Sequence, residues 1–103
     1  MNAHGLSDSH LNIIRSILHP YADKLTQVGL FGSRATGTYR PHSDIDMVLY
    51  GAISEAEVAH LSTVFSDSLL PFTVDLHAYH LITYPPLKAH IDAVMLPLIQ
   101  QPF

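Results

Sequence analysis

The sequence predicts a small α+β domain, in which a mixed, mainly four-stranded sheet carries helices over one face. Three observations support this class. Helical and alternating apolar patterns interleave along the chain, as in a sheet with helices packed on it. Apolar residues make up 48% and charged residues 14% of the sequence, enough apolar surface for a core. The length of 103 residues fits one domain, residues 1–103, and leaves no room for a second.

The first third of the chain contains a predicted helix and a predicted strand. The helix begins after Ser7 or Ser9, either of which can cap it, and ends before Pro20. Its apolar side chains recur at helical spacing: Leu11, Ile14, Ile17 and Leu18. A short apolar run over residues 28–31 indicates a buried strand. Residues 32–43 are rich in Gly, Ser, Thr and Arg, so we expect a turn and loop with one helical turn.

A second strand and a second helix follow in the middle of the chain. Residues 43–50 alternate between polar and apolar side chains, which predicts a strand with two different faces. Ser54 and Glu57 form a capping box, the pattern of a helix start. We expect this helix to end before Pro71 and to turn four side chains toward the core: Val58, Leu61, Phe65 and Leu69.

Two more strands and a last helix complete the pattern. Residues 72–78 alternate again, and they place Asp75 and His77 on the face opposite to the apolar side chains. The proline pair at 85–86 suits the first turn of a helix that reaches about residue 92. Residues 93–99 are expected to form a closing strand, which the proline within it restricts to an edge of the sheet.

Composition and charge exclude several classes of function. Five Lys and Arg stand against nine Asp and Glu, a formal net charge of −4, which is the wrong balance for a protein that wraps nucleic acid. The absence of cysteine excludes disulfides, thiolate nucleophiles and cysteine zinc sites. The eight histidines lack the tight spacing of zinc ligands, so we interpret them as scattered surface side chains. Without a signal peptide or an apolar run of ~20 residues, we expect a cytoplasmic protein with no membrane partner.

Gly32 and Ser33 stand where the first predicted strand ends and a turn begins. Glycine lets the backbone approach a ligand closely, and free N–H groups at a turn attract phosphate oxygens. The hydroxyl of Ser33 adds a further donor. Gly and Ser also punctuate many ordinary strand ends, so the dipeptide on its own does not predict a phosphate site.

Two aspartates, Asp44 and Asp46, share one face of the second predicted strand. Their charges repel each other unless a cation lies between them, and Mg²⁺ uses one or two carboxylates together with substrate phosphates. A solvent-facing strand with two exposed charges explains the pair equally well. Asp75 favours the metal site, because three carboxylates meet if its strand is a neighbour of residues 43–50. Such a cluster can hold two metal ions about 4 Å apart.

Together these segments resemble a known family. Residues 30–37 read Leu-Phe-Gly-Ser-Arg-Ala-Thr-Gly and residues 43–47 read Ser-Asp-Ile-Asp-Met. This is similar to the signature of the DNA polymerase β-like nucleotidyltransferase superfamily, Gly-Ser and then Asp-x-Asp after a spacer of about ten residues, which here is residues 34–43. The short length resembles the minimal nucleotidyltransferase (MNT) branch, the antitoxin half of HEPN/MNT toxin–antitoxin pairs. The resemblance covers nearly the whole chain and implies the palm fold of that superfamily.

The resemblance implies a role for each matching residue. The triphosphate of a nucleotide would be held by three residues: Gly32, Ser33 and Arg34. Two Mg²⁺ ions would be held by three catalytic carboxylates: Asp44, Asp46 and Asp75. Of these, Asp75 would also help to activate the attacking hydroxyl. Thr36 stands where many minimal members have a second basic residue, which predicts weaker binding of phosphate.

The function that the resemblance implies is Mg²⁺-dependent transfer of AMP from ATP, with release of pyrophosphate. The acceptor would be a tyrosine of a HEPN-type ribonuclease toxin, which this modification silences. Two alternatives stay open: an antitoxin that blocks its toxin by binding alone, and a nucleotide-binding regulatory subunit of a larger transferase. The preferred nucleotide, the number of groups transferred and the oligomeric state, homo- or hetero-oligomeric, also stay open.

Overall fold

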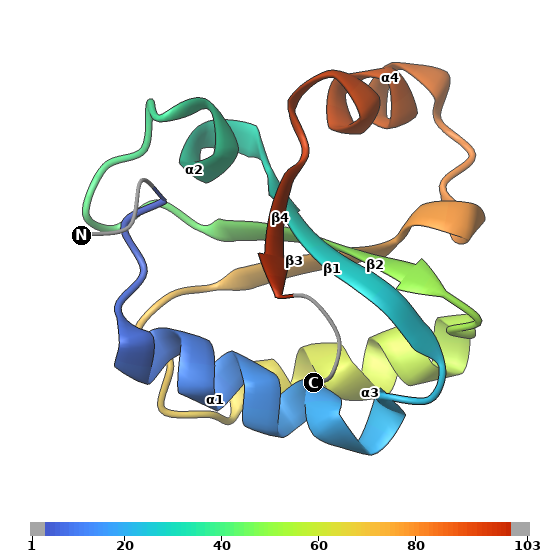
Figure 1. Ribbon diagram of the computed structural model, residues 1–103, viewed down its shortest axis with the longest axis horizontal. Coiled ribbons are helices and arrows are strands. Elements are labelled where there is room, and N and C mark those ends of the chain that lie inside the picture. The colour runs from blue at the N-terminus through green and yellow to red at the C-terminus, as the bar shows by residue number, and fades with distance from the viewer. Residues whose placement is uncertain (1–3, 100–103) are drawn as a thin grey trace.

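A mixed four-stranded sheet organises residues 4–99, which are the residues that this computed structural model describes (Figure 1). The strands are β1 (Leu25–Phe31), β2 (Ile45–Gly51), β3 (Val74–Ala78) and β4 (Leu96–Ile99), in the order β3-β2-β1-β4. β1 runs antiparallel to both β2 and β4, whereas β2 and β3 are parallel. The prediction of a single domain over residues 1–103 also takes in residues 1–3 and 100–103, which lie outside the described residues.

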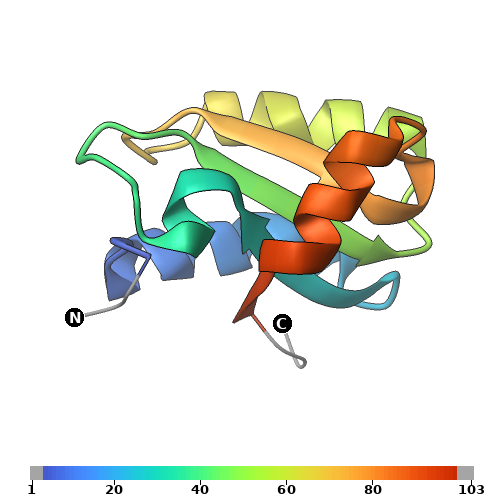
Figure 2. The same cartoon turned by 90° about the horizontal axis from the view of Figure 1, so that it is seen from above.

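Helices cover both faces of the sheet (Figures 1 and 2). α1 (Asp8–Leu18) and α3 (Glu55–Ser66) lie on one face, and α2 (Gly32–Thr36) and α4 (Pro85–Val94) lie on the other. Short 3₁₀ turns follow α1 at His19–Tyr21 (η1) and β3 at Tyr79–Leu81 (η2). The expectation of helices over one face was therefore wrong.

Two apolar clusters explain why both faces are covered. The larger cluster lies under α1 and α3, and its buried members include Ile14, Met47 and Leu61. The smaller cluster lies under α4 and consists of Phe31, Val48 and Ile91. Phe31 and Val48 share the face of the sheet that also carries the aspartates. Their burial supplies the second, smaller core, since apolar area removed from water stabilises the fold wherever it lies.

The helix starts follow the predicted caps. Ser7 caps α1, because its hydroxyl accepts a hydrogen bond from the N–H of His10 at 3.1 Å. The capping box at α3 is confirmed: the Glu57 N–H donates to Ser54 Oγ at 3.2 Å, and the Ser54 N–H donates to Glu57 Oε1 at 3.0 Å. Each cap satisfies N–H groups that the helix itself leaves free.

Several boundaries differ from the sequence prediction; β1, for example, begins at Leu25 instead of residue 28. α3 ends at Ser66, because the N–H and the hydroxyl of Ser68 both bond to the Phe65 carbonyl, and Leu69 is consequently 90% exposed instead of buried. β3 begins only at Val74. The last strand is shorter than predicted, since residues 93–94 still belong to α4, but its place at an edge of the sheet is confirmed.

The parallel pair β2 and β3 is joined by α3, so the chain crosses the sheet face between the two strands. Parallel neighbours need a crossover of this kind. The pairing sets the two strands in register with Asp46 opposite Asp75. Among residues 4–99 no helix is long and apolar enough to cross a membrane.

Candidate active site

The candidate site lies at one end of the sheet, where β1 ends and β2 and β3 begin. Asp46 is the central residue, since it pairs with Phe31 on β1 and with Asp75 on β3. The sequence predicted a cluster of three carboxylates if the strand of Asp75 was a neighbour of the strand of Asp46, and the two strands are indeed paired. Phe31 packs against Ile91 of α4, and because directly paired residues share a sheet face, Asp46 and Asp75 lie on that same face.

Gly32 lets the Asp46 carboxylate lie directly against the start of α2. Gly32 has a positive φ of 68°, a conformation that side-chain-bearing residues rarely adopt. A Cβ at this position would collide with Oδ2 of Asp46. The Gly-Ser turn and the Asp-x-Asp strand are thus in contact through this pair of residues, and the contact requires glycine.

The electrostatics of Asp46 set it apart from the other acids. Burial raises the pKa of the Asp46 carboxyl above its ordinary value, and the nearby charges of Asp75 and Asp44 raise it further. His77 and His90 act in the opposite direction, as cations do. The ionised carboxylate is therefore held at a cost in free energy that a bound cation would reduce.

Asp75 lies on the outer strand of the sheet and is open to solvent, with 58% of its side chain exposed. His77, two residues along the same face of β3, has its Nε2 3.2 Å from Oδ2 of Asp75. The imidazole also lies against Phe31, with the ring centres 5.6 Å apart. Because the imidazole lies within hydrogen-bonding distance, it restricts the orientation of the carboxylate.

Sequence reasoning missed two histidines at this site. His77 and His90 both approach Phe31, and both are close enough to Asp46 to affect its pKa. The signal for His77 was present, because it shares a strand face with Asp75. His90 comes from α4, and nothing in the sequence pattern indicates which face of the sheet that helix covers.

Asp44 precedes β2 and is exposed. Within residues 4–99 no three Asp, Glu or His side chains are arranged as a ready set of metal ligands. The carboxylates nonetheless fit Mg²⁺, which typically takes one or two protein carboxylates and completes its shell with phosphate and water oxygens. The donor set is thus suited to a metal ion that is bound together with a nucleotide.

Ser33, in the first turn of α2, is half-buried. Its carbonyl accepts the N–H of Gly37 and, at 3.0 Å, the N–H of Thr38, and these bonds close the helical turn. The Thr36 hydroxyl bonds back to the carbonyl of Gly32 at 3.3 Å. The turn that would cradle a phosphate is therefore held from its far end by these hydrogen bonds.

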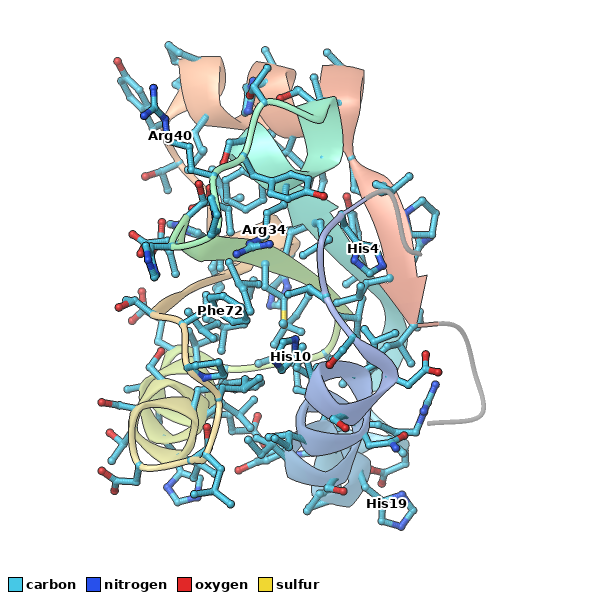
Figure 3. The ribbon with its side chains drawn as sticks, turned by 90° about the vertical axis from the view of Figure 1, so that its left-hand side faces the viewer. His4, His10, His19, Arg34, Arg40 and Phe72 are labelled. Atoms are coloured by element: carbon cyan, nitrogen blue, oxygen red, sulfur yellow. The ribbon has the colours of Figure 1, made fainter. Side chains whose placement is uncertain are left out.

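Arg34 lies inside the protein, with only 2% of its surface exposed. Its guanidinium donates to the backbone carbonyls of His4 and Ser43, at 2.9 Å each (Figure 3). In this geometry the guanidinium is directed into the fold, and its contact with a triphosphate stays a prediction. The sequence placed Arg34 in the motif, but its burial follows from the direction in which the short α2 helix turns it.

A cavity of about 450 Å³ opens beside Asp75, between α3, β3 and α4. His77 forms part of its wall, and most of the remaining wall is apolar, including Val58, Leu76 and Leu87. A group that enters this cavity meets His77, which lies within hydrogen-bonding distance of Asp75.

A Gly-Ser turn against an Asp-x-Asp strand, with a third acid on the parallel neighbour, defines a nucleotidyltransferase. The model of one family, described as polymerase beta nucleotidyltransferase, matches residues 12–100, and the chain belongs to that family. The predicted resemblance to the superfamily is confirmed by this match. A comparison with curated proteins gave no match.

Several solved structures with a similar fold are toxin–antitoxin structures. A toxin–antitoxin with AMP-PNP is 24% identical, with a TM-score of 0.71 over 89% of this chain and 74% of that chain. A variant of the MntA toxin–antitoxin is 27% identical, with a TM-score of 0.69 over 88% and 72%. A structure of a tri-AMPylated Shewanella oneidensis HEPN toxin in complex with MNT antitoxin is 22% identical, with a TM-score of 0.65 over 88% of this chain and 70% of that chain. The predicted resemblance to MNT antitoxins is confirmed at the level of the fold.

Proposed function

We propose that this chain is the antitoxin of a HEPN-type toxin and transfers AMP from ATP to a tyrosine hydroxyl of that toxin. The observation that carries the proposal is the contact between the two halves of the motif, Gly32 against Asp46, with Asp75 in register beside it. The similar structures support the choice of donor and acceptor, since one contains AMP-PNP and another contains a toxin that carries AMP. With ATP as donor and a ribonuclease as acceptor, we propose that the reaction takes place in the cytoplasm.

Different residues would bind the triphosphate and the Mg²⁺ ions. Gly32 and Ser33 would hold the triphosphate, through a closely approaching backbone and a hydroxyl donor. Asp44 and Asp46 would hold Mg²⁺, with Asp75 completing the site for a second ion. A bound Mg²⁺ supplies positive charge that offsets the charge of the phosphates and of the leaving pyrophosphate. The free-energy cost of ionised Asp46 in the metal-free protein fits this assignment.

The transfer step is a displacement at phosphorus. The acceptor oxygen forms a bond to the α-phosphorus, the bond from that phosphorus to the bridging oxygen breaks, and pyrophosphate leaves. Asp75 is the residue placed to accept the proton of the hydroxyl, with His77 restricting its orientation. Its exposure on the outer strand allows an acceptor on another protein to reach it.

The test uses the partner protein, ATP and intact-mass spectrometry. Wild type with Mg²⁺ is expected to increase the mass of the toxin by one or more AMP units, which survive denaturation and map to tyrosine. Asp75→Asn keeps the size of the side chain but cannot accept the proton, so it should still bind ATP with Mg²⁺ yet leave the toxin unmodified. A toxin that is inhibited but unmodified, equally by both proteins, would contradict transfer and establish inhibition by binding alone.

A further inference from the structure

Arg34 is a charged residue buried among neutral partners. Within the part of the chain that the structure describes, its guanidinium has no ion pair with a carboxylate. Burying a charge without an opposite charge is costly, so the neutral partners of the guanidinium must offset that cost. Its contacts are two backbone carbonyls and two aromatic rings, those of Tyr39 at 5.1 Å and Phe72 at 4.5 Å from the guanidinium carbon.

These contacts join three separate segments around α2. One carbonyl belongs to His4, at the start of the described chain, and the other to Ser43, in the loop before β2. The Phe72 ring comes from the segment before β3. Figure 3 shows Arg34 pointing between the segment of His4 and that of Phe72.

Ser43 is the residue directly before Asp44. Its carbonyl accepts both Nη2 of Arg34 at 2.9 Å and Nε at 3.3 Å, a paired contact that only a guanidinium makes. Ser43 also closes a turn with Arg40: its N–H donates to the Arg40 carbonyl at 3.0 Å, and its hydroxyl accepts the Arg40 N–H at 2.8 Å. Arg34 thus holds a closed turn that ends one residue before the aspartate.

The residue after Asp44 is held from the other side. The Ile45 N–H donates to the Thr73 carbonyl at 2.8 Å, and the neighbouring Phe72 is the residue on which Arg34 packs. Asp44 itself is exposed and lies outside β2. The backbone bonds of Ser43 and Ile45 therefore fix the backbone position from which the Asp44 side chain extends.

We propose that Arg34 is a positioning residue that fixes Asp44 relative to the Gly32–Ser33 turn, and that it does not contact the nucleotide. Arg34 follows this turn directly in the sequence and bonds to the residue directly before Asp44. It therefore couples the two halves of the motif at a set distance. The role of Asp44 itself rests on the function proposed above, whereas the ordering of the 40–45 loop by Arg34 does not.

The first experiment measures amide hydrogen exchange in the metal-free protein, without substrate. Arg34→Met keeps the aliphatic length and removes the donors; Arg34→Lys keeps the charge but cannot form the paired contact. We expect the amides of Ser43 and Ile45 to exchange at least about tenfold faster in both variants, since each loses hydrogen bonds to a charged group. Arg15→Met, on the exposed side of α1, is the matched control and should leave these amides unchanged.

Unchanged exchange at Ser43 and Ile45 in a folded Arg34 variant would overturn the proposal. If both Arg34 variants fail to fold, Phe72→Leu takes their place, because it removes the ring under the guanidinium and keeps an apolar side chain. It should accelerate the same two amides by a smaller factor. Protection equal to that of wild type in this variant would also count against the proposal.

The second experiment separates positioning from phosphate contact. With an active wild type, Arg34→Lys is expected to raise the Mg²⁺ concentration for half-maximal transfer about tenfold and to leave binding of ATP without metal unchanged. Lost ATP binding with an unchanged Mg²⁺ requirement would assign Arg34 to the triphosphate and overturn the proposal. If wild type itself transfers nothing, the proposed function fails, and the exchange measurement still decides whether Arg34 orders the loop.

Discussion

Gly32→Ala is the most informative single substitution in this protein, because it changes the backbone and the site at once. Gly32 has a φ of 68°, which an alanine adopts only with strain. The added methyl group would also collide with Oδ2 of Asp46. The substitution must therefore move the carboxylate, the turn or both.

Gly37 provides a control that isolates the first effect. It has a φ of 81° at the end of α2, and a Cβ there would meet no atom within 4 Å. Gly37→Ala should therefore cost only the strain of a left-handed alanine, about 1–2 kcal/mol. In a domain of this size each kcal/mol lowers the melting temperature by roughly 4–8 °C.

Gly32→Ala should cost the same strain and a further ~1–3 kcal/mol for the added atom in a filled space. It should also reduce transfer by on the order of a hundredfold, the penalty for moving a catalytic group by about 1 Å. Gly37→Ala should retain its transfer rate when assayed below its lowered melting temperature.

Urea unfolding and AMP transfer, measured for both variants under the same conditions, test this reasoning. Equal losses of stability would show that Asp46 does not occupy the space beside Gly32. A Gly32→Ala variant with the transfer rate of wild type would refute the claim that this contact sets the site.

Three further predictions concern charge. Asp46→Asn should abolish transfer, while the free energy of unfolding of the metal-free variant at pH 7 should equal or exceed that of wild type. The reason is that the Asp46 carboxyl has a raised pKa in the folded protein, so the fold loses stability as pH rises and this carboxyl ionises. A marked loss of stability of the variant in EDTA would contradict this. Mg²⁺ with ATP should raise the melting temperature, by about 2.7 kcal/mol of stabilisation at a hundred times Kd; no shift at millimolar concentrations would count against a metal–nucleotide site. The Lys24 ammonium, 2.6 Å from the Glu57 carboxylate, and the Ser54 N–H lower the Glu57 pKa from 4.5 to about 2. The Lys24–Glu57 pair should therefore stabilise the fold above pH 4.5 and cease to do so as pH falls toward 2. Urea unfolding should show this as a free energy of unfolding that falls over that pH range, and Lys24→Met should make the fall smaller.

The two short motifs of the site could be predicted from the sequence. Gly32 and Ser33 stand at a strand end, and Asp46 follows at a spacing that a known family shares. Both are properties of short segments. Asp75 is different, because its place beside Asp46 depends on the order of strands in the sheet, and alternation of apolar residues carries no information about that order.

What the sequence could not predict depends on tertiary packing. The second face of the sheet is covered by a helix because Phe31 and Val48 are apolar and pack against Ile91 there. The same face also carries acids, so the sequence pattern of each strand alone indicates a face that is partly open to solvent. The burial of Arg34 follows from three segments that meet only in the folded chain. Leu69 was assigned to the core by periodicity, but hydrogen bonds from Ser68 end the helix before it.

The parallel pairing of β2 and β3 has a consequence for how the protein acquires its activity. The two strands cannot pair through a tight turn, because parallel strands need a crossover, which here is α3. Asp46 and Asp75 become neighbours only when α3 has packed on the sheet. Such contacts between distant segments form late and slowly in folding. A nascent or partly unfolded chain therefore carries the acids but not the assembled site, and a cation held by both carboxylates would stabilise only the completed fold.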